Sequence, residues 1–418
     1  MPKRIALISY HTCPLAAAEG KETGGMNIYI LSTAKELAKA GYTIDIFTRS
    51  QDPKQQHIIN LAERLRVIHI PAGPEVEMLP NSEENKKKFR EYLPEFIKNI
   101  QTFQQQKKIV YDLIDAHYYL SGLAGLELQN TFTNSKTIPL IMTFHTLALM
   151  KNLTSFSSLT EQEKARIQAE FLLTSKAQLI ISPSSNEQKY LQYLYNVPPE
   201  KIAVVAPGVD TKLFHPQDKQ QAKKAIGADL GHKMILFVGR IEPVKGIEVL
   251  IYAVKILLQH YPQLKACLWI VGGDTSQNPQ LWPKHLHKLE ELRQLLNLHT
   301  TVKFVGQKQQ HELPNYYNAA DLVVMPSHYE SFGLAALEAM ACGTPVITTN
   351  VTGISNLFDE NSQKYITVAN NPLILAEDMA EIILHHDAQI DQEMYNMIKE
   401  YDWEKVTQKL SNAYGLLK

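Results

Sequence analysis

Short apolar runs alternate with amphipathic segments along the first half of the chain. The apolar runs predict buried strands at 4–9, 43–48, 66–70, 112–116, 138–143, 178–182 and 202–205. Amphipathic patterns predict helices at 26–40, 85–104, 160–176 and 185–194. Strands that alternate with helices favour a parallel sheet covered by helices on both faces.

The same alternation restarts after a segment with two prolines and a glycine at 206–216, which we interpret as a hinge between domains. Strands are predicted at 234–238, 266–271, 301–305, 321–325 and 345–348. Helices are predicted at 246–259, 283–296, 311–319 and 333–341. The pattern indicates an α/β fold of two Rossmann-like, doubly wound parallel-sheet domains, at 1–206 and 207–400. Such sheets bind ligands at the carboxyl ends of their strands, so we expect the site in a cleft between the two domains.

The composition of the chain argues against several kinds of binding partner and structural site. The 418 residues carry a formal net charge of −1, so no global field attracts nucleic acid or an acidic membrane, and neither is expected as a partner. The three cysteines form no CxxC pair, which argues against a zinc cluster or a disulfide framework and fits a reducing compartment. The richest apolar stretch, 138–150, is too short to span a bilayer, and a soluble, cytoplasmic protein is expected. The sequence leaves open whether the chain forms a homodimer.

The strongest local signal is the run from Glu330 to Glu338, Glu-Ser-Phe-Gly-Leu-Ala-Ala-Leu-Glu, which follows a predicted strand and opens a helix near Gly333. Backbone N–H groups at a helix start attract an anion. Glu330 could accept hydrogen bonds from sugar hydroxyls and Glu338 could bind a ribose diol. The alternative is that Glu330 caps the helix and Glu338 is a solvated surface residue.

A second signal follows the strand at 234–238. Arg240 and Lys245 are placed on the loop and at the start of the next helix, where a planar fork and a point charge suit a diphosphate leaving group. Two exposed surface cations are the alternative. Their place at the carboxyl end of a strand favours the binding role.

Two weaker signals lie in the first half. Thr23-Gly24-Gly25 precedes the first helix, where glycines let backbone approach a phosphate. His145 and His117 each end a predicted strand, although buried polar histidines are common. The sequence has no GxGxxG fingerprint, so no dinucleotide cofactor is expected. It also has no Asp-x-Asp, so no metal is expected to be required.

In combination these motifs resemble family four of the retaining nucleotide-sugar glycosyltransferases, which have the GT-B fold. The resemblance covers most of the chain and implies a helix at about 402–418 that packs back on the first domain. It implies that the second domain binds the donor and the first the acceptor, that Arg240 and Lys245 hold the diphosphate, and that His145 contacts the donor sugar near the reacting carbon. Further donor contacts are implied for Gly25, Glu330, Ser331, Phe332, Gly333, Leu334 and Glu338.

The likeness is greater to the mycothiol-pathway branch of this family, whose enzymes transfer N-acetylglucosamine from UDP to inositol phosphate. Gly-Gly-Met-Asn27, His117-Tyr118-Tyr-Leu-Ser-Gly and His145-Thr-Leu-Ala are similar to its pattern. That likeness implies a small phosphorylated acceptor held by Asn27, Tyr118, Thr146 and Arg166. A lysine also belongs to the acceptor site, for which 86, 87 and 88 are candidates. Sucrose-phosphate synthases share several motifs, so fructose 6-phosphate stays open as acceptor.

The expected mechanism is same-face substitution, in which the departing phosphate oxygen takes the acceptor's proton and no protein base is required. A nucleotide-sugar epimerase and a sugar-nucleotide-binding pseudoenzyme are the rival functions. The sequence does not separate glucose from N-acetylglucosamine as the donor sugar. The basic face of helix 85–104 could touch a membrane, but a solvated face is the expectation.

Overall fold

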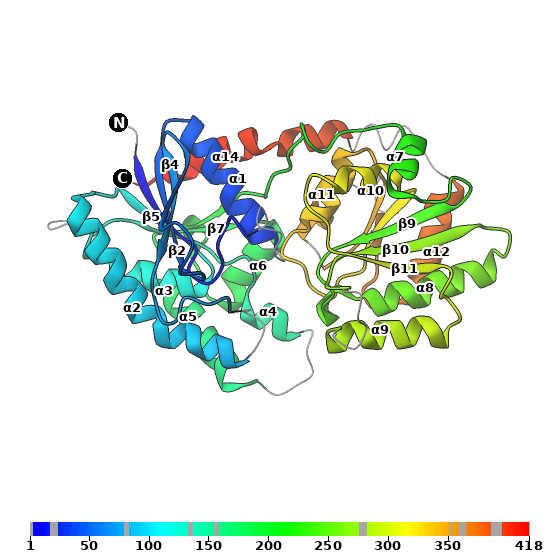
Figure 1. Cartoon of the computed structure of the whole chain (residues 1–418), viewed down its shortest axis with the longest axis horizontal. Helices are drawn as coiled ribbons and strands as arrows, with labels where there is room; N and C mark the ends of the chain where they lie inside the picture. Colours follow the sequence, from blue (N-terminus) through cyan, green and yellow to red (C-terminus); the bar gives the residue numbers. More distant parts are fainter. Residues whose placement is uncertain are drawn as a thin grey trace. The chain divides into compact units, whose positions relative to one another are not determined.

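The protein's structure, a computed structural model, describes residues 3–16, 24–78, 83–132, 137–153, 159–275, 282–351, 353–358, 365–385 and 395–417. The chain divides into two compact units, Met1–Ala206 with Trp403–Lys418, and Pro207–Asp402 (Figure 1). The first division falls within the proline- and glycine-containing segment at 206–216.

The first unit is built on an eight-stranded sheet in the order β3-β4-β2-β1-β5-β6-β7-β8. All neighbouring strands are parallel except β3, which pairs antiparallel with β4 at one edge. The strand order reverses direction between β1 and β5, which makes their carboxyl ends the topological switch point. The strands are β1 (Arg4–Ile8), β2 (Thr43–Arg49), β3 (Ile58–Ala62), β4 (Leu65–Ile70), β5 (Leu113–His117), β6 (Leu140–Thr143), β7 (Leu179–Ser182) and β8 (Ile202–Val204).

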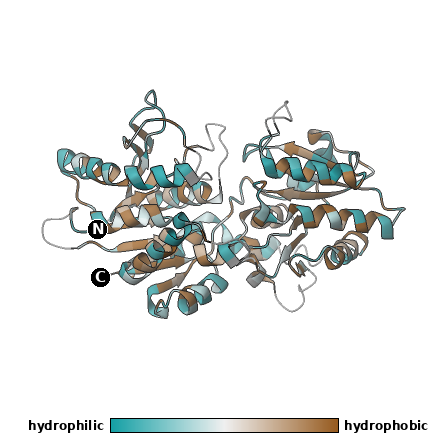
Figure 2. Ribbon diagram, turned by 90° about the horizontal axis from the view of Figure 1, so that it is seen from below, coloured by the Kyte–Doolittle hydropathy of each residue, from teal (hydrophilic) through white to brown (hydrophobic). Residues whose placement is uncertain are grey.

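Helices cover this sheet, with α14 beside α1 and α3 packed against α2 and α5 (Figure 1). In Figure 2 the strands carry hydrophobic colours and the helices carry both hydrophobic and hydrophilic ones, as expected for helices with one face on a sheet. The helices are α1 (Gly25–Lys39), α2 (Glu83–Lys107), α3 (Tyr119–Leu128), α4 (Ala148–Leu153), α5 (Glu161–Lys176), α6 (Ser185–Leu194) and α14 (Trp403–Gly415), with a 3-10 turn η1 (Pro199–Lys201).

The second unit has a six-stranded, all-parallel sheet in the order β11-β10-β9-β12-β13-β14. Its switch point lies between β9 and β12. The strands are β9 (Lys233–Val238), β10 (Ala266–Val271), β11 (Val302–Gly306), β12 (Leu322–Met325), β13 (Val346–Thr349) and β14 (Ile366–Thr367).

Two groups of helices flank the second sheet, with α7, α10 and α11 on one face and α8, α9 and α12 on the other (Figure 1). The predicted fold class, two Rossmann-like parallel-sheet domains, is therefore confirmed. The helices are α7 (Lys219–Ile226), α8 (Ile247–His260), α9 (Lys284–Leu295), α10 (Leu313–Ala319), α11 (Leu334–Ala341) and α12 (Pro372–Leu384), with 3-10 turns η2 (Pro243–Lys245), η4 (Gly353–Leu357) and η6 (Lys399–Tyr401).

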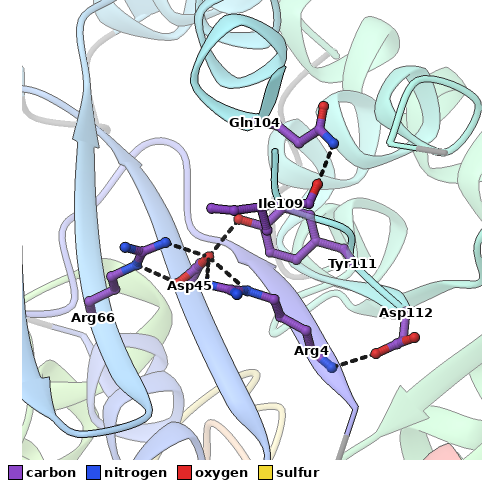
Figure 3. A network of polar contacts seen from close by, with 7 residues as sticks. All are labelled: Arg4, Asp45, Arg66, Gln104, Ile109, Tyr111 and Asp112. Atoms are coloured by element: carbon purple, nitrogen blue, oxygen red, sulfur yellow. Dashed lines mark hydrogen bonds and ion pairs between the residues drawn. The ribbon is translucent and has the colours of Figure 1, made fainter. Parts of the chain in front are cut away.

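A buried carboxylate, Asp45 of β2, ties together the amino-terminal parts of several strands of the first sheet (Figure 3). Arg66 of β4 donates to it from Nε at 2.6 Å and from Nη2 at 3.0 Å, and Arg4 of β1 donates from Nη2 at 3.1 Å. The Tyr111 hydroxyl, just before β5, donates at 2.6 Å. Because these contacts lie toward the amino ends of the strands, the cluster stabilises the sheet away from the edge where ligands bind.

None of the helices in the described part of the chain combines the length and apolar composition needed to cross a bilayer.

Candidate functional site

In the second unit, both sequence signals lie at the switch point of the sheet. Arg240 follows the carboxyl end of β9 and Glu330 follows that of its parallel neighbour β12. The two loops are joined by a hydrogen bond from the His328 N–H to the Val244 carbonyl at 2.8 Å. At Gly246, a Cβ would lie 2.2 Å from the Pro326 carbonyl oxygen, so the loops approach as closely as only glycine allows.

Lys245 and Glu330 form an ion pair across these loops, although they are 85 positions apart in the sequence. Their side chains are 13% and 20% exposed, so both are reachable by a ligand while sheltered from bulk water. The helix-cap alternative for Glu330 is wrong, because α11 has Gly333 as its N-cap and no side chain caps it. Arg240 pairs with Glu242 at 2.7 Å and is 40% exposed on the same loop.

The segment that opens α11 is held by a neighbouring loop. Gly333 has a φ of +112°, a conformation that favours glycine, and the helix begins at Leu334. The Ile354 N–H donates to the Phe332 carbonyl at 2.9 Å, and a Cβ at Gly353 would lie 2.2 Å from the Ser331 carbonyl oxygen. The N-terminus of α11, where the helix dipole favours an anion, therefore lies at the same edge of the sheet as Lys245.

Glu338 lies inside the second unit rather than on its surface. The residue is 6% exposed, and Oε2 accepts a hydrogen bond at 2.7 Å from the hydroxyl of Tyr317 in α10. Burial raises the pKa of Glu338 to about 7, although the Tyr317 hydrogen bond acts in the opposite direction. The alternative of a solvated surface glutamate is wrong. Glu338 is instead a buried carboxyl group that titrates near neutral pH.

In the first unit, the predicted residues come from the carboxyl ends of β5 and β6, from the start of α1 and from α5. Gly25 is the first residue of α1, and Thr23 of the Gly-Gly motif lies outside the described residues. Asn27 is buried, and its Nδ2 donates to Thr12 Oγ1 at 2.9 Å and to the Cys13 carbonyl at 3.1 Å. Within the described part of the chain, Asn27 Oδ1 has no hydrogen-bond partner.

Three of the predicted acceptor residues form one cluster. The Arg166 guanidinium lies 4.8 Å from the centroid of the Tyr118 ring. Its Nη2 donates to the carbonyl of Thr146 at 2.6 Å and to the Thr146 hydroxyl at 3.1 Å, and Nε donates to Glu170 at 2.7 Å. The Arg166 side chain is 12% exposed. A cation on an aromatic ring with so little exposure is fixed in place rather than freely mobile.

His11 joins this cluster, and sequence reasoning missed it. It follows β1 at the switch point, and its ring centroid lies 4.5 Å from that of Tyr118. Burial, and then the nearby Arg166 cation, lower the pKa of His11 to about 3, so the imidazole is neutral at physiological pH. Its Nδ1 is buried and has no partner among the described residues. The one available signal was its place after the first strand, which several residue types share.

The two predicted histidines, His117 and His145, also contact each other. His117 Nδ1 lies 2.9 Å from His145 Nε2, and His117 Nε2 lies 3.5 Å from Asp115. Asp115 accepts a hydrogen bond at 2.6 Å from the hydroxyl of Tyr414 in α14. Burial, followed by His117, lowers the pKa of His145 well below its usual value, so a neutral imidazole is available there. His145 also has a φ of +60°, which is unusual for a residue other than glycine.

The three candidate lysines lie on α2. Lys88 pairs with Glu84 at 2.6 Å and Lys87 with Glu91 at 3.8 Å, both one turn away on the same helix. These contacts do not single out one lysine for an acceptor. Among the residues described, no three histidine, cysteine, aspartate or glutamate side chains gather closely enough to hold a metal ion. All three cysteines are buried and unbridged.

Comparisons with known proteins agree with this arrangement. Residues 23–213 match the family model described as Glycosyltransferase Family 4, and residues 218–402 match the model described as Glycosyl transferases group 1. The chain is 35% identical over 417 residues to a D-inositol 3-phosphate glycosyltransferase of Corynebacterium glutamicum, covering 99% of this chain and 96% of the relative. It is 33% identical to the protein of the same name from Saccharomonospora viridis, covering 99% and 94%.

Solved structures agree on the fold. Sucrose-phosphate synthase from Thermosynechococcus elongatus superposes with a TM-score of 0.84 at 29% identity, with 99% of each chain covered. Anabaena HepE, solved with UDP and glucose, gives a TM-score of 0.73 at 18% identity, covering 99% of this chain and all of that one, and shows likeness of fold alone. The family models, the relatives and the two-sheet architecture give one result: the chain belongs to family four of the glycosyltransferases and has the GT-B fold.

Proposed function

We propose that this glycosyltransferase moves a hexose or N-acetylhexosamine from a UDP-sugar to a small phosphorylated polyol or sugar, with retention of the anomeric configuration. The observation that carries the proposal is the group of Arg240, Lys245 and Glu330 at the switch point of the second sheet. Cations, a carboxylate and a helix N-terminus meet there at one sheet edge. This combination suits a sugar diphosphate, which offers negative charge and hydroxyl groups together.

In this proposal the second unit binds the donor. Arg240 and Lys245 bind the diphosphate, and Lys245 exchanges its contact with Glu330 for a phosphate oxygen. Glu330 then accepts hydrogen bonds from sugar hydroxyls, and Glu338 accepts them from the ribose. Backbone from Ser331 to Leu334 contacts the sugar and phosphates, while Gly25 of the first unit leaves room for the diphosphate.

The first unit binds the acceptor. Support comes from the Arg166 cluster, in which a nearly buried cation is fixed against Tyr118 and Thr146. A phosphate monoester is the natural ligand for such a guanidinium. Hydroxyl groups of the acceptor hydrogen-bond to Asn27 Oδ1 and His11 Nδ1, which are both buried and have no hydrogen-bond partner among the described residues.

The reaction is a substitution at the anomeric carbon through an oxocarbenium-like transition state. The bond from that carbon to the β-phosphate oxygen breaks, and a bond to the acceptor oxygen forms on the same face. The acceptor's proton passes to the departing phosphate oxygen, so the products are UDP and the glycoside. His145 contacts the donor sugar near the reacting carbon. Catalysis comes from positioning and from charge stabilisation by Arg240 and Lys245, without a catalytic metal ion.

D-inositol 3-phosphate is our first choice of acceptor because of the relatives at 33–35% identity that carry its name. Fructose 6-phosphate is the second, favoured by the TM-score of 0.84 with sucrose-phosphate synthase. Both are phosphorylated and polyhydroxylated, so the Arg166 cluster alone does not separate them.

Proton NMR of the purified product tests this proposal. Wild-type protein is incubated with UDP-glucose or UDP-N-acetylglucosamine and each of the two acceptors in turn. The small anomeric coupling of an α-glycoside is expected from these α-linked donors. A β-glycoside would exclude retention, and an epimerised sugar nucleotide with no glycoside would favour the epimerase instead.

A further inference from the structure

Glu170 of α5 is a fully buried carboxylate that accepts hydrogen bonds from three directions. Arg166 Nε donates to Oε1 at 2.7 Å, the backbone N–H of Ala148 donates to Oε2 at 2.9 Å, and the Tyr195 hydroxyl donates to Oε2 at 2.5 Å. Burying a carboxylate is costly unless its charge is paired and its oxygens are satisfied. Each of these three hydrogen bonds offsets part of the cost of burying the Glu170 carboxylate.

The contact with Glu170 determines how Arg166 can move. A free arginine side chain loses rotamer entropy when one conformation is fixed. Here the Nε edge is held by Glu170, Nη2 is held by Thr146, and the plane lies on Tyr118. Among the described residues, no hydrogen-bond partner reaches Nη1. The guanidinium therefore keeps a donor for a ligand while its other edges are fixed.

Glu170 also holds the turn that carries Thr146. Ala148, which donates to Glu170, is the first residue of α4, so the carboxylate occupies the position of a helix cap. The Tyr195 hydroxyl accepts from the Leu149 N–H at 3.3 Å and adds a second contact to the same turn. One buried group thus fixes both the guanidinium and the hydroxyl-bearing residue that it binds.

We propose that Glu170 is a positioning residue that makes the site selective for phosphorylated acceptors, by presenting the Arg166 guanidinium in a fixed orientation. This inference rests on the proposed function. If only the charge of Glu170 mattered, Glu170 would weaken the binding of a phosphorylated acceptor, because a negative group behind Arg166 repels a phosphate. Removing the charge tightens acceptor binding if Glu170 is only a counter-ion, and weakens it if Glu170 positions Arg166.

The test is the substitution Glu170→Gln, because an amide has one acceptor oxygen where the carboxylate has two. Glutamine cannot accept from Arg166 and also from Ala148 and Tyr195. We expect KM for D-inositol 3-phosphate, or for fructose 6-phosphate if that is the substrate, to rise by about tenfold or more, the size of one lost charge-assisted hydrogen bond. KM for the donor should change less than about threefold, because the donor contacts stay intact.

Glu161→Gln is the matched control, because it makes the same change on the same helix at an exposed position. It should leave both KM values at the wild-type level. Tyr195→Phe is a second variant that keeps the charge and removes one anchor. It should raise the acceptor KM by a smaller factor of about three, and it serves if Glu170→Gln does not fold.

An Arg166→Ala background checks that Glu170 acts through Arg166. In that background, Glu170→Gln should raise the acceptor KM no further. An unchanged or lower acceptor KM in the single variants would overturn the inference, as would equal rises in donor and acceptor KM, which indicate general loosening. Wild-type turnover separates this failure from that of the proposed function. Without turnover of any phosphorylated acceptor both fail, whereas an active wild type with unaffected variants overturns only the role of Glu170.

Discussion

The pH dependence of donor binding is the sharpest prediction from the buried Glu338. Its pKa is about 7 because burial disfavours the charged form. A carboxylate accepts hydrogen bonds from both hydroxyls of a ribose diol, whereas the protonated acid keeps less acceptor capacity. If Glu338 binds the ribose, then donor binding selects the ionised form, and affinity should fall as the pH is lowered through 7.

The magnitude follows from the fraction of Glu338 that is ionised. With a pKa of about 7, that fraction is roughly nine-tenths at pH 8 and roughly one-tenth at pH 6, and apparent affinity scales with the competent fraction. The dissociation constant for the donor should therefore be about tenfold larger at pH 6 than at pH 8. Binding at pH 7 should also release about half a proton, because the complex favours the ionised carboxylate.

Isothermal titration calorimetry with UDP-glucose measures both quantities. UDP-glucose is preferable to UDP, because the terminal phosphate of UDP itself titrates near pH 6. Titrations in two buffers of different ionisation enthalpy give the number of protons released. Glu338→Gln is the control variant, since it cannot ionise, and any slope that it retains belongs to other groups.

A second variant sharpens the assignment. The Tyr317 hydroxyl lowers the pKa of Glu338 through its hydrogen bond. Tyr317→Phe should therefore raise that pKa and move the loss of affinity to higher pH. Equal donor affinity at pH 6 and pH 8 in the wild type, or the same slope in wild type and Glu338→Gln, would refute the role of Glu338.

Two further predictions follow from other parts of the structure. Lys245→Ala should lower kcat/KM by about 10²- to 10³-fold, because the leaving diphosphate loses a cation. Lys265→Ala, at an exposed position, is the control and should leave kcat/KM unchanged. Near-normal kcat/KM in folded Lys245→Ala would show that Lys245 has no role in the mechanism. Asp45→Ala should destabilise the first unit by about 2–4 kcal/mol, since Tyr111 loses a buried partner while the two arginines partly reach water. Hydrogen exchange in β1, β2 and β4 would report the Asp45 effect, and unchanged protection would contradict it.

Much of the fold could be predicted because buried parallel strands are continuous apolar runs. The predicted runs at 4–9, 43–48 and 266–271 differ from the observed strands by no more than one residue at either end. Two of the elements that were missed, β3 and α3, have weak patterns. β3 is an edge strand in which no residue is fully buried, and α3 is apolar around most of its surface, so neither shows the expected period.

The candidate site was predictable in its positions but not in its partners. Arg240 and Lys245 follow the end of β9, a strand that the apolar run at 234–238 predicts. The pairing of Lys245 with Glu330 depends on the neighbouring places of β9 and β12 in the sheet, which the chain order alone does not give. The burial of Glu170 likewise depends on tertiary packing, because a glutamate in a helix of polar composition is usually exposed.

Acceptor-dependent release of UDP is the decisive test of the proposed sugar transfer. Purified wild-type protein is given UDP-glucose or UDP-N-acetylglucosamine in EDTA, with and without D-inositol 3-phosphate or fructose 6-phosphate. We expect one pairing of donor and phosphorylated acceptor to release UDP about a hundredfold faster or more than the donor alone, and the unphosphorylated acceptor to give far less release. UDP release that ignores the acceptor, or no release with any of the four pairings, would contradict the proposed sugar transfer.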